Sequence, residues 1–183
     1  MASLPNTKFV TYEEWLQMPE VKDEEVVNGE IRVMPAANAN HAFIVARTQM
    51  ALMSQLDQAQ FYVLTGSFGI VIRISPLICR TPDLAVLNRA TFVEIDGYFR
   101  FAPDLAVEGL SPRNAPKDIR QKIAEYASPG VPELWIFSQD DRNVEVLLLE
   151  EDRLRRNAFL SQGFLKPTRF QHVQINIASI WPD

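Results

Sequence analysis

The pentapeptide Pro-Asp-Leu-Ala-Val occurs twice in this chain, at Pro82–Val86 and at Pro103–Val107. Each copy has the composition of a short buried strand, and proline is tolerated at the first position of a strand, where its missing N–H costs least. The second copy runs directly into Glu108. The repeat is too short to mark a duplicated domain, but it predicts two neighbouring strands in one sheet.

Antiparallel pairing of these strands would bring two acidic side chains together. One register sets Asp83 opposite Glu108, and the same register sets Ala85 opposite Ala106. Residues two apart on a strand share a face, so both carboxylates would project past a floor of small alanines. Carboxylates about 4 Å apart repel by about 4 kcal/mol at an effective dielectric constant near 20, so they need a cation or a shared proton. A divalent metal ion is the usual partner of oxygen ligands, and the pair therefore predicts a metal-dependent enzyme.

Length and composition predict a single domain. The chain has 183 residues, 47% of them hydrophobic, which is enough for one well-packed domain over residues 1–183 and short for two. No apolar stretch reaches the roughly eighteen residues of a membrane span, and the first residues lack the apolar core of a signal peptide. The single cysteine, Cys79, excludes an internal disulfide, so we expect a cytoplasmic protein. Cys79 itself is interpreted as a small buried hydrophobe and not as a catalytic thiol.

The net charge is −5 and the isoelectric point is about 5.1, which argues against a protein that coats nucleic acid through a generally basic surface. A local basic groove on an acidic body remains compatible with this balance. One basic cluster follows Glu108 and consists of Arg113, Lys117, Arg120 and Lys122. A second, Arg153, Arg155 and Arg156, is preceded by three acids at positions 150–152, and this pattern indicates a solvated turn.

Local signals predict alternating helices and strands. Thr11 as N-cap with Glu14 at the capping-box position predicts a short helix. Asn28-Gly29 predicts a type I′ hairpin over residues 25–33, and apolar periodicity predicts a long helix from about Asn40 to Leu56. The other expected elements are strands near Phe61–Thr65 and Phe68–Ile74, a helix over Pro116–Ala127, an antiparallel pair over Glu133–Phe137 and Val144–Leu149, and an edge strand over Val173–Ile177. This order predicts an α/β domain with a mixed sheet and helices on its faces.

The helix after Glu108 offers a cation for the carboxylate pair. On a helical wheel Lys122 lies at the border of the buried stripe, whereas Lys117 points almost opposite, into solvent. A border lysine can lay its stem along the sheet and bring its ammonium to the strand ends, where it would stabilise a hydroxide or a charged phosphate. Asp118 lies one turn before Lys122 and could hold it in place. Alternatively, Lys122 only pairs with Asp118 on the surface.

Several spaced motifs together resemble a known family. They are Pro82-Asp83, then Pro103-Asp104-Leu105-Ala106-Val107-Glu108-Gly109-Leu110-Ser111-Pro112, then Asp118, Lys122 and Tyr126, then Gly130-Val131-Pro132-Glu133-Leu134-Trp135. With these motifs the chain resembles the Uma-type restriction endonuclease family of the PD-(D/E)XK nuclease superfamily. The hairpin from Glu25 to Glu30 and His41 at the start of the long helix extend the similarity to roughly residues 10–150.

The resemblance implies a restriction-endonuclease-like fold, with a central mixed β-sheet flanked by helices and an N-terminal β-hairpin extension. It also implies hydrolysis of phosphodiester bonds in duplex DNA with magnesium, for which manganese can substitute. By resemblance Asp83, Glu108 and the backbone carbonyl of Gly109 hold the metal. The lysine that the superfamily carries two residues after the glutamate is Leu110 here; members of this family draw it from the following helix, where Lys122 stands. Other members usually carry a β-branched residue at the position of Gly109.

The remaining candidates have two readings each. By resemblance Glu25 borders the metal and His41 contacts substrate; otherwise Glu25 is a solvated hairpin carboxylate and His41 a helix-start residue. Arg113 and Lys117 are expected to contact DNA phosphates, which carry affinity but little sequence information. The residues expected to be structural or superficial are Asp104 as a turn or cap residue, His172 on the surface, and Trp135 and Tyr126 in the core.

Two further functions stay open at this point. The first is a catalytically silent module that keeps the nuclease fold and binds DNA or a protein. The second is a hydrolase of a small phosphorylated substrate, because a metal pair recognises phosphate and not a base. A homodimer is plausible for a nuclease that cuts two strands, and the tail strand over 173–177 is its expected contact.

Overall fold

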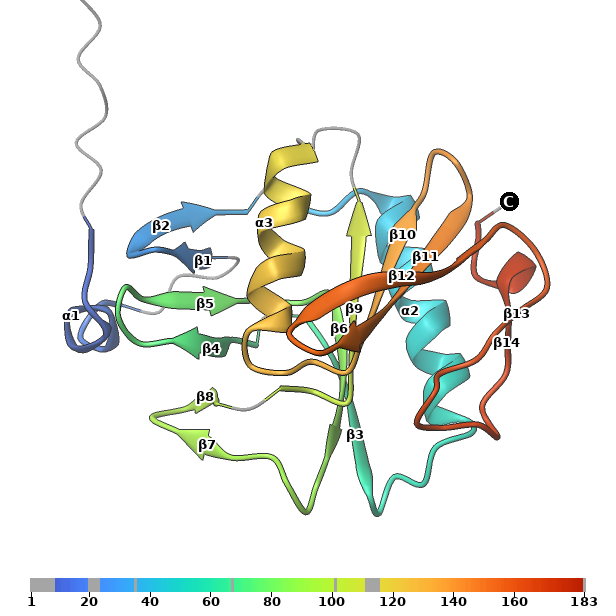
Figure 1. Cartoon of the computed structure of the whole chain (residues 1–183), viewed down its shortest axis with the longest axis horizontal. Helices are drawn as coiled ribbons and strands as arrows, with labels where there is room; N and C mark the ends of the chain where they lie inside the picture. Colours follow the sequence, from blue (N-terminus) through green and yellow to red (C-terminus); the bar gives the residue numbers. More distant parts are fainter. Residues whose placement is uncertain are drawn as a thin grey trace, which may run out of the picture.

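The structure is a computed structural model of the chain, and it describes residues 9–19, 24–34, 36–66, 68–100, 102–110 and 116–182. Within these ranges the chain forms two six-stranded sheets, a small two-stranded sheet and two main helices (Figure 1). The predicted α/β fold with a mixed sheet, flanking helices and an N-terminal hairpin is confirmed. The strands are nevertheless divided between two large sheets, where one was expected.

The main sheet carries the repeated pentapeptide. Its strand order is β12-β11-β10-β9-β6-β3, and β9 and β10 are parallel while the other neighbours are antiparallel. The strands are β3 (Phe61–Thr65), β6 (Leu84–Asn88), β9 (Leu105–Leu110), β10 (Glu133–Ser138), β11 (Asn143–Glu150) and β12 (Arg153–Leu160). Both copies of the repeat are thus adjacent strands, β6 and β9, and each strand begins two residues after its proline.

The second sheet, which we call the hairpin sheet, has the order β2-β1-β5-β4-β8-β7. Its strands are β1 (Glu24–Val27), β2 (Glu30–Val33), β4 (Ile70–Arg73), β5 (Ile78–Arg80), β7 (Glu94–Ile95) and β8 (Tyr98–Phe99). The predicted turn between β1 and β2 is confirmed, since Asn28 and Gly29 both have positive φ angles, 53° and 82°. The short helix α1 (Tyr12–Leu16) has the predicted capping box between Thr11 and Glu14.

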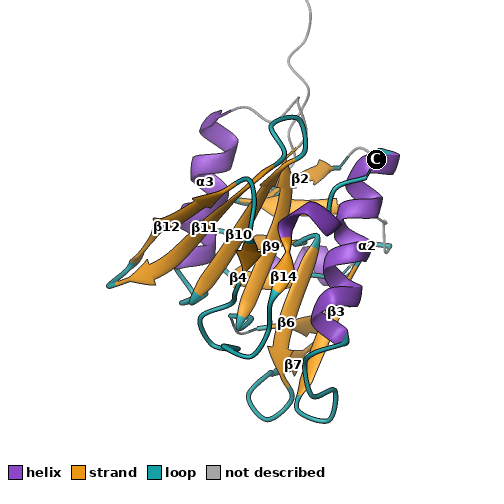
Figure 2. Cartoon of the chain, turned by 90° about the vertical axis from the view of Figure 1, so that its right-hand side faces the viewer, coloured by secondary structure: helices purple, strands orange, loops and turns teal. Residues whose placement is uncertain are grey.

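The two main helices lie on opposite faces of the main sheet (Figure 2). Helix α2 (Ala39–Met53) buries Ile44, Thr48 and Leu52, and helix α3 (Pro116–Ala127) has the predicted bounds. Alternation along β9 assigns each side chain to one helix, because Leu105 and Val107 belong to the α2 core while Ala106 belongs to the α3 core. By the same alternation Glu108 faces α3.

Two expectations about the C-terminal third are wrong. The segment with Arg153, Arg155 and Arg156 is not a turn but the edge strand β12, because its backbone pairs with β11 along its length. The arginines stay exposed there and contact nearby acids, such as Glu145 at 2.6 Å from Arg156. The high local charge indicated a turn because charged side chains are solvated. In β12 the side chains are solvated, but the backbone is paired with β11.

The tail does not form an edge strand of a large sheet. The strand β14 (Ile175–Asn176) pairs only with β13 (Phe164–Leu165), and a 3-10 turn, η1 (Ile177–Ser179), follows it. Val173, Ile175 and Ile177 are buried in the α2 core. The apolar side chains of the tail therefore belong to the core of the domain.

No helix in the described part of the chain is long and apolar enough to cross a membrane.

Candidate active site

The register predicted from the repeat is confirmed. Ala85 lies opposite Ala106 and Leu84 opposite Val107 in the antiparallel pair of β6 and β9. Continued by one residue, this register sets Asp83 opposite Glu108 at the carboxyl end of β9. The two acids, twenty-five positions apart in sequence, therefore converge at one edge of the main sheet.

The carboxylate of Glu108 is buried, with 7% of the residue exposed, and both of its oxygens have partners from α3. Lys122 Nζ lies 2.8 Å from Oε2, and the Tyr126 hydroxyl donates to Oε1 at 2.6 Å. Burial raises the pKa of Glu108 to about 7, and the charges of Asp83 and Glu25 add to this rise while Lys122 opposes it. Burial and the adjoining Glu108 raise the pKa of Tyr126 well above its usual range, so its hydroxyl remains a donor.

Lys122 reaches the site as the wheel predicted, but its second partner is Glu25. Its ammonium lies 3.1 Å from Glu25 Oε1, in addition to its contact with Glu108. Burial disfavours the ammonium, but the two carboxylates outweigh burial and raise the pKa of Lys122. Lys122 is therefore a charged amine held between two buried acids.

Glu25 is no solvated hairpin residue, since only 2% of it is exposed. Its Oε2 accepts from Arg80 at 2.6 Å, and its Oε1 accepts from the backbone N–H of Thr81 at 3.2 Å. Burial raises the pKa of Glu25, but Lys122 and Arg80 together lower it below its usual value. Arg80 also donates through Nε to Glu125 at 2.6 Å. The hairpin sheet and α3 are thus joined by a buried ion network that ends at the amine of Lys122.

Asp83 is held from the other side, by α2 and by the backbone of β9. His41, in the first turn of α2, places Nε2 3.0 Å from Asp83 Oδ1, and the Gly109 N–H donates to Oδ2 at 2.7 Å. The hydrogen bond to Asp83 raises the pKa of His41, although burial opposes it. The Asn38 side chain caps this helix by accepting from the His41 N–H at 2.9 Å.

Glycine at position 109 is required by the position of His41. A Cβ on Gly109 would lie 2.7 Å from Cε1 and 2.8 Å from Nδ1 of the imidazole. Any side chain there would push the ring away from Asp83. In this chain, therefore, glycine at position 109 allows the imidazole to pack against the backbone of β9.

Some predicted site residues lie apart from this cluster. Asp118 and Lys117 are exposed in the first turn of α3, and Lys122 turns to Glu108 and Glu25 and not to Asp118. Arg113 lies outside the described residues. Asp104 is buried and pairs with Arg169 at 2.5 Å. It directly precedes β9, at the opposite end of that strand from Glu108.

Sequence reasoning missed three residues of the cluster. Tyr126 was assigned to the core, and it is fully buried, but its hydroxyl also contacts Glu108. Its spacing of four residues from Lys122 on one helix face could have indicated this. Arg80, 4% exposed, follows Ile78 and Cys79, and an arginine after apolar strand residues is a signal for a buried ion pair. Glu125 gave no comparable signal.

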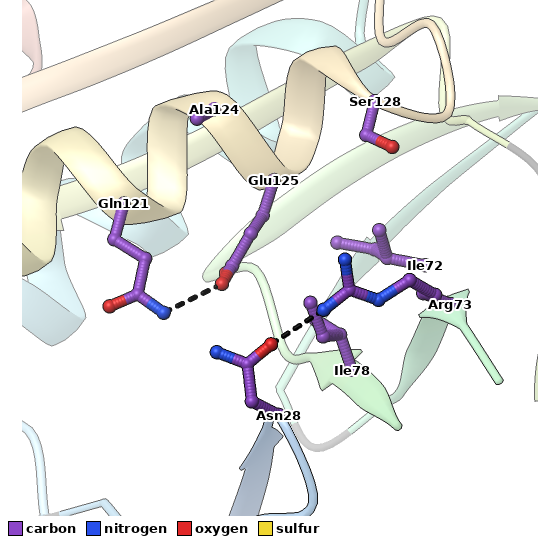
Figure 3. A pocket seen from close by; sticks show the side chains of 8 residues that line it. All are labelled: Asn28, Ile72, Arg73, Ile78, Gln121, Ala124, Glu125 and Ser128. Atoms are coloured by element: carbon purple, nitrogen blue, oxygen red, sulfur yellow. Dashed lines mark hydrogen bonds between the residues drawn. The ribbon is translucent and has the colours of Figure 1, made fainter. Parts of the chain in front are cut away.

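A surface hollow of about 320 Å³ lies beside the outer end of this network (Figure 3). Gln121 and Glu125 of α3 line one side of it, and Asn28 and Arg73 of the hairpin sheet line another. Asp83, Glu108 and His41 are not among its lining residues. The hollow therefore lies apart from the carboxylates at the edge of the main sheet.

The mixed sheets and flanking helices form an α/β domain with the restriction-endonuclease-like fold. The family model described as "Putative restriction endonuclease", Uma2, matches residues 9–178, and the chain belongs to this family. The fold is similar to that of a protein of Anabaena variabilis described as a "putative nuclease belonging to DUF820", with a TM-score of 0.77 and 18% identity. The similarity covers 93% of this chain and 97% of that one. No curated protein sequence matches the chain.

Family and fold together support a nuclease.

Proposed function

We propose that the chain is a metal-dependent endonuclease that hydrolyses phosphodiester bonds in duplex DNA. The observation that carries the proposal is the convergence of Asp83 and Glu108 at one sheet edge with the charged amine of Lys122 2.8 Å from Glu108. Acids at a strand end that share a site need a cation, and a lysine beside them suits reactions in which negative charge develops on phosphate.

The residues present fit magnesium, which needs only one or two carboxylates and keeps several waters. The described residues contain no cluster of three or more His, Cys, Asp or Glu side chains in a metal-binding arrangement. Asp83 and Glu108, with the backbone carbonyl of Gly109, would hold the ion, and manganese would substitute. The raised pKa of Glu108, caused by burial and by two neighbouring acids, indicates that a further positive charge is favourable there.

When bound, a magnesium ion lowers the pKa of a coordinated water and polarises a phosphate oxygen. The other contributions come from the chain itself. Lys122, fixed by Glu25 and Glu108, places a permanent positive charge where a hydroxide or a phosphorane-like oxygen needs it. His41 orients the carboxylate of Asp83 through their 3.0 Å contact. Lys117, exposed at the start of α3, and Arg113 are proposed to bind flanking phosphates.

The decisive experiment is plasmid cleavage by Asp83→Ala and Glu108→Ala variants. We expect both to lose magnesium-dependent nicking of supercoiled DNA to the background level while they keep the circular dichroism spectrum of the parent. Asp152→Ala is the matched control, because this acid is exposed in the turn before β12 and should leave the rate unchanged. Full activity in either site variant would refute the assignment.

One observation favours a catalytically silent binding module as the second candidate. All four carboxylate oxygens of Asp83 and Glu108 already have protein partners, so the cluster is electrostatically supported without a metal. Titration calorimetry with Mn²⁺ separates the two functions. Heat that is lost in Glu108→Ala supports the nuclease, whereas no binding at millimolar concentration supports the silent module. Turnover of small phosphorylated compounds but not of plasmid would instead indicate a metabolite hydrolase.

A further inference from the structure

The hydroxyl of Tyr126 is not needed to fill the core around it. Tyr126 is fully buried, and its ring belongs to the α3 core together with Ala106, Val131 and Leu134. A phenylalanine ring would fill nearly the same space, and a buried hydroxyl lowers stability unless it is hydrogen-bonded. This hydroxyl donates to Glu108 Oε1 at 2.6 Å. What the hydroxyl adds to the protein therefore concerns the carboxylate of Glu108.

Tyr126 gives Glu108 a rigid attachment, whereas the other attachment of this carboxylate is flexible. Oε2 of Glu108 is held by the ammonium of Lys122 at 2.8 Å, but that ammonium also lies 3.1 Å from Glu25 and ends a long flexible stem. The phenol oxygen, in contrast, is fixed by a ring that has no exposed surface. Contacts at both oxygens set the orientation of the carboxylate plane as well as its position.

The partner acid is held in the same manner. Asp83 has the imidazole of His41 at one oxygen and the backbone N–H of Gly109 at the other. Tyr126 is the neutral donor of Glu108, as this N–H is of Asp83. A neutral donor fixes an oxygen without cancelling the charge of the carboxylate, and the oxygen keeps a second lone pair for a cation.

We propose that Tyr126 is a positioning residue that holds Glu108 in the orientation required to bind a divalent metal ion. The inference rests on the proposed metal-dependent function. Magnesium tolerates little departure from octahedral geometry, so a carboxylate that is free to rotate is a weaker ligand for it. Groups that orient metal ligands typically contribute about 10- to 100-fold in metal affinity.

Titration calorimetry of Tyr126→Phe with Mn²⁺ tests this role, because the change removes the hydroxyl and keeps the ring. At a pH of about 8.5, above the pKa of about 7 of Glu108, competition by protons is small. We expect the affinity for Mn²⁺ to fall by about tenfold or more. Tyr12→Phe is the matched control, since it also removes a hydroxyl that donates to a carboxylate, that of Asp96 at 2.7 Å. The control should bind Mn²⁺ as the parent does.

Plasmid nicking separates positioning of the metal ligand from a purely structural role. Tyr126→Phe should need about tenfold more magnesium to reach half of its maximal rate. At saturating magnesium its rate should return to within about threefold of the parent rate, because the ligand itself is still present. A rate that stays low at saturating magnesium, with unchanged metal affinity, would overturn the inference.

A further measurement uses the parent protein and does not depend on the folding of a variant. Binding of Mg²⁺ at Glu108 should alter the near-ultraviolet absorption of Tyr126, because the strength of a hydrogen bond follows the charge of its acceptor. The difference spectrum should persist in Tyr12→Phe and disappear in Tyr126→Phe.

The outcomes distinguish this inference from the proposed function. Equal Mn²⁺ affinity in the parent and in Tyr126→Phe, or metal binding without a tyrosine difference spectrum in the parent, would overturn the positioning role and leave the proposed metal site standing. A parent that binds no Mn²⁺ would overturn the proposed function, and the inference with it.

Discussion

The two main helices cover opposite faces of one sheet, yet they distribute polar side chains in opposite ways. Helix α3 turns Lys122, Glu125 and Tyr126 inward, where all three take part in the buried polar network. Helix α2 keeps apolar residues on both sides, with Leu52 fully buried and Met50 70% exposed. Each helix therefore breaks the simple rule of apolar inside and polar outside, but in a different direction.

The two distributions differ in what they cost in free energy. Inward charges on α3 cost desolvation free energy, and they persist only because each carboxylate finds a cation in the network. Outward apolar groups on α2 leave apolar surface in contact with water. The proposed chemical site lies on the α3 side, whereas the outward side of α2 exposes apolar side chains. His41, at the first turn of α2, is the point where the apolar helix also contributes to the site.

The largest expected effect on stability comes from removing Arg80, which lies between Glu25 and Glu125. Arg80→Ala leaves the buried Glu125 without a cation and leaves Glu25 with Lys122 alone, and such a change costs about 3–5 kcal/mol. Denaturant unfolding measures this free energy. Arg73→Ala, an exposed arginine on the neighbouring strand β4, should cost less than about 1 kcal/mol. Equal losses in both variants would mean that the network contributes nothing beyond an ordinary surface contact.

The next effect concerns the two lysines of α3. Lys122→Ala should lower the rate of plasmid nicking by about 10²–10³-fold, because it removes one preorganised charge from the site. Lys117→Ala, on the solvent side of the same helix, should change mainly the salt dependence of DNA binding. The comparison between an inner and an outer lysine fails if both variants lose the same fraction of activity while folding is unchanged.

A double-mutant cycle tests the junction between α2 and the site. Gly109→Ala alone should destabilise the protein by about 1–3 kcal/mol, since its Cβ would overlap the His41 ring. In a His41→Ala background the same change should be close to neutral, because the space is then free. Urea unfolding of the four proteins gives the coupling free energy. Strictly additive effects would show that His41 does not occupy this position in solution.

The smallest predicted effect is on the pH dependence of metal binding. The pKa of Glu108 is raised to about 7 by burial, so below that pH the residue is largely protonated and a poor ligand. Mn²⁺ affinity should therefore rise as pH increases through about 7 and level off above it, with a slope of about tenfold per pH unit on the acid side. Calorimetry across this range measures it, and Lys122→Met, which removes the charge that lowers this pKa, should move the rise to higher pH. An affinity independent of pH between about 5.5 and about 8 would contradict the assigned environment of Glu108.

Local patterns are sufficient to predict the carboxylate pair. Side chains alternate along a strand with a period of two, so only a few registers bury the apolar side chains of both pentapeptides. The observed register pairs Ala85 with Ala106, and its continuation sets Asp83 opposite Glu108. Helical periodicity similarly places Lys122 at the border of the buried stripe. In both cases neighbouring residues in the chain carry the information.

The amino-acid sequence alone therefore accounts for the two facing acids, the helix that follows them and the hairpin turn at Asn28-Gly29. Long-range packing, in contrast, brings Glu25 and Arg80 of the hairpin sheet to the site, where Glu25 pairs with Lys122. It also pairs the charged strand β12 with β11 at the edge of the main sheet. These contacts join residues 45 or more positions apart, or depend on backbone pairing, and no local period encodes them. The sequence shows that α2 has apolar residues on both faces. Only the packing of Ile44, Thr48 and Leu52 against the main sheet shows which face remains exposed.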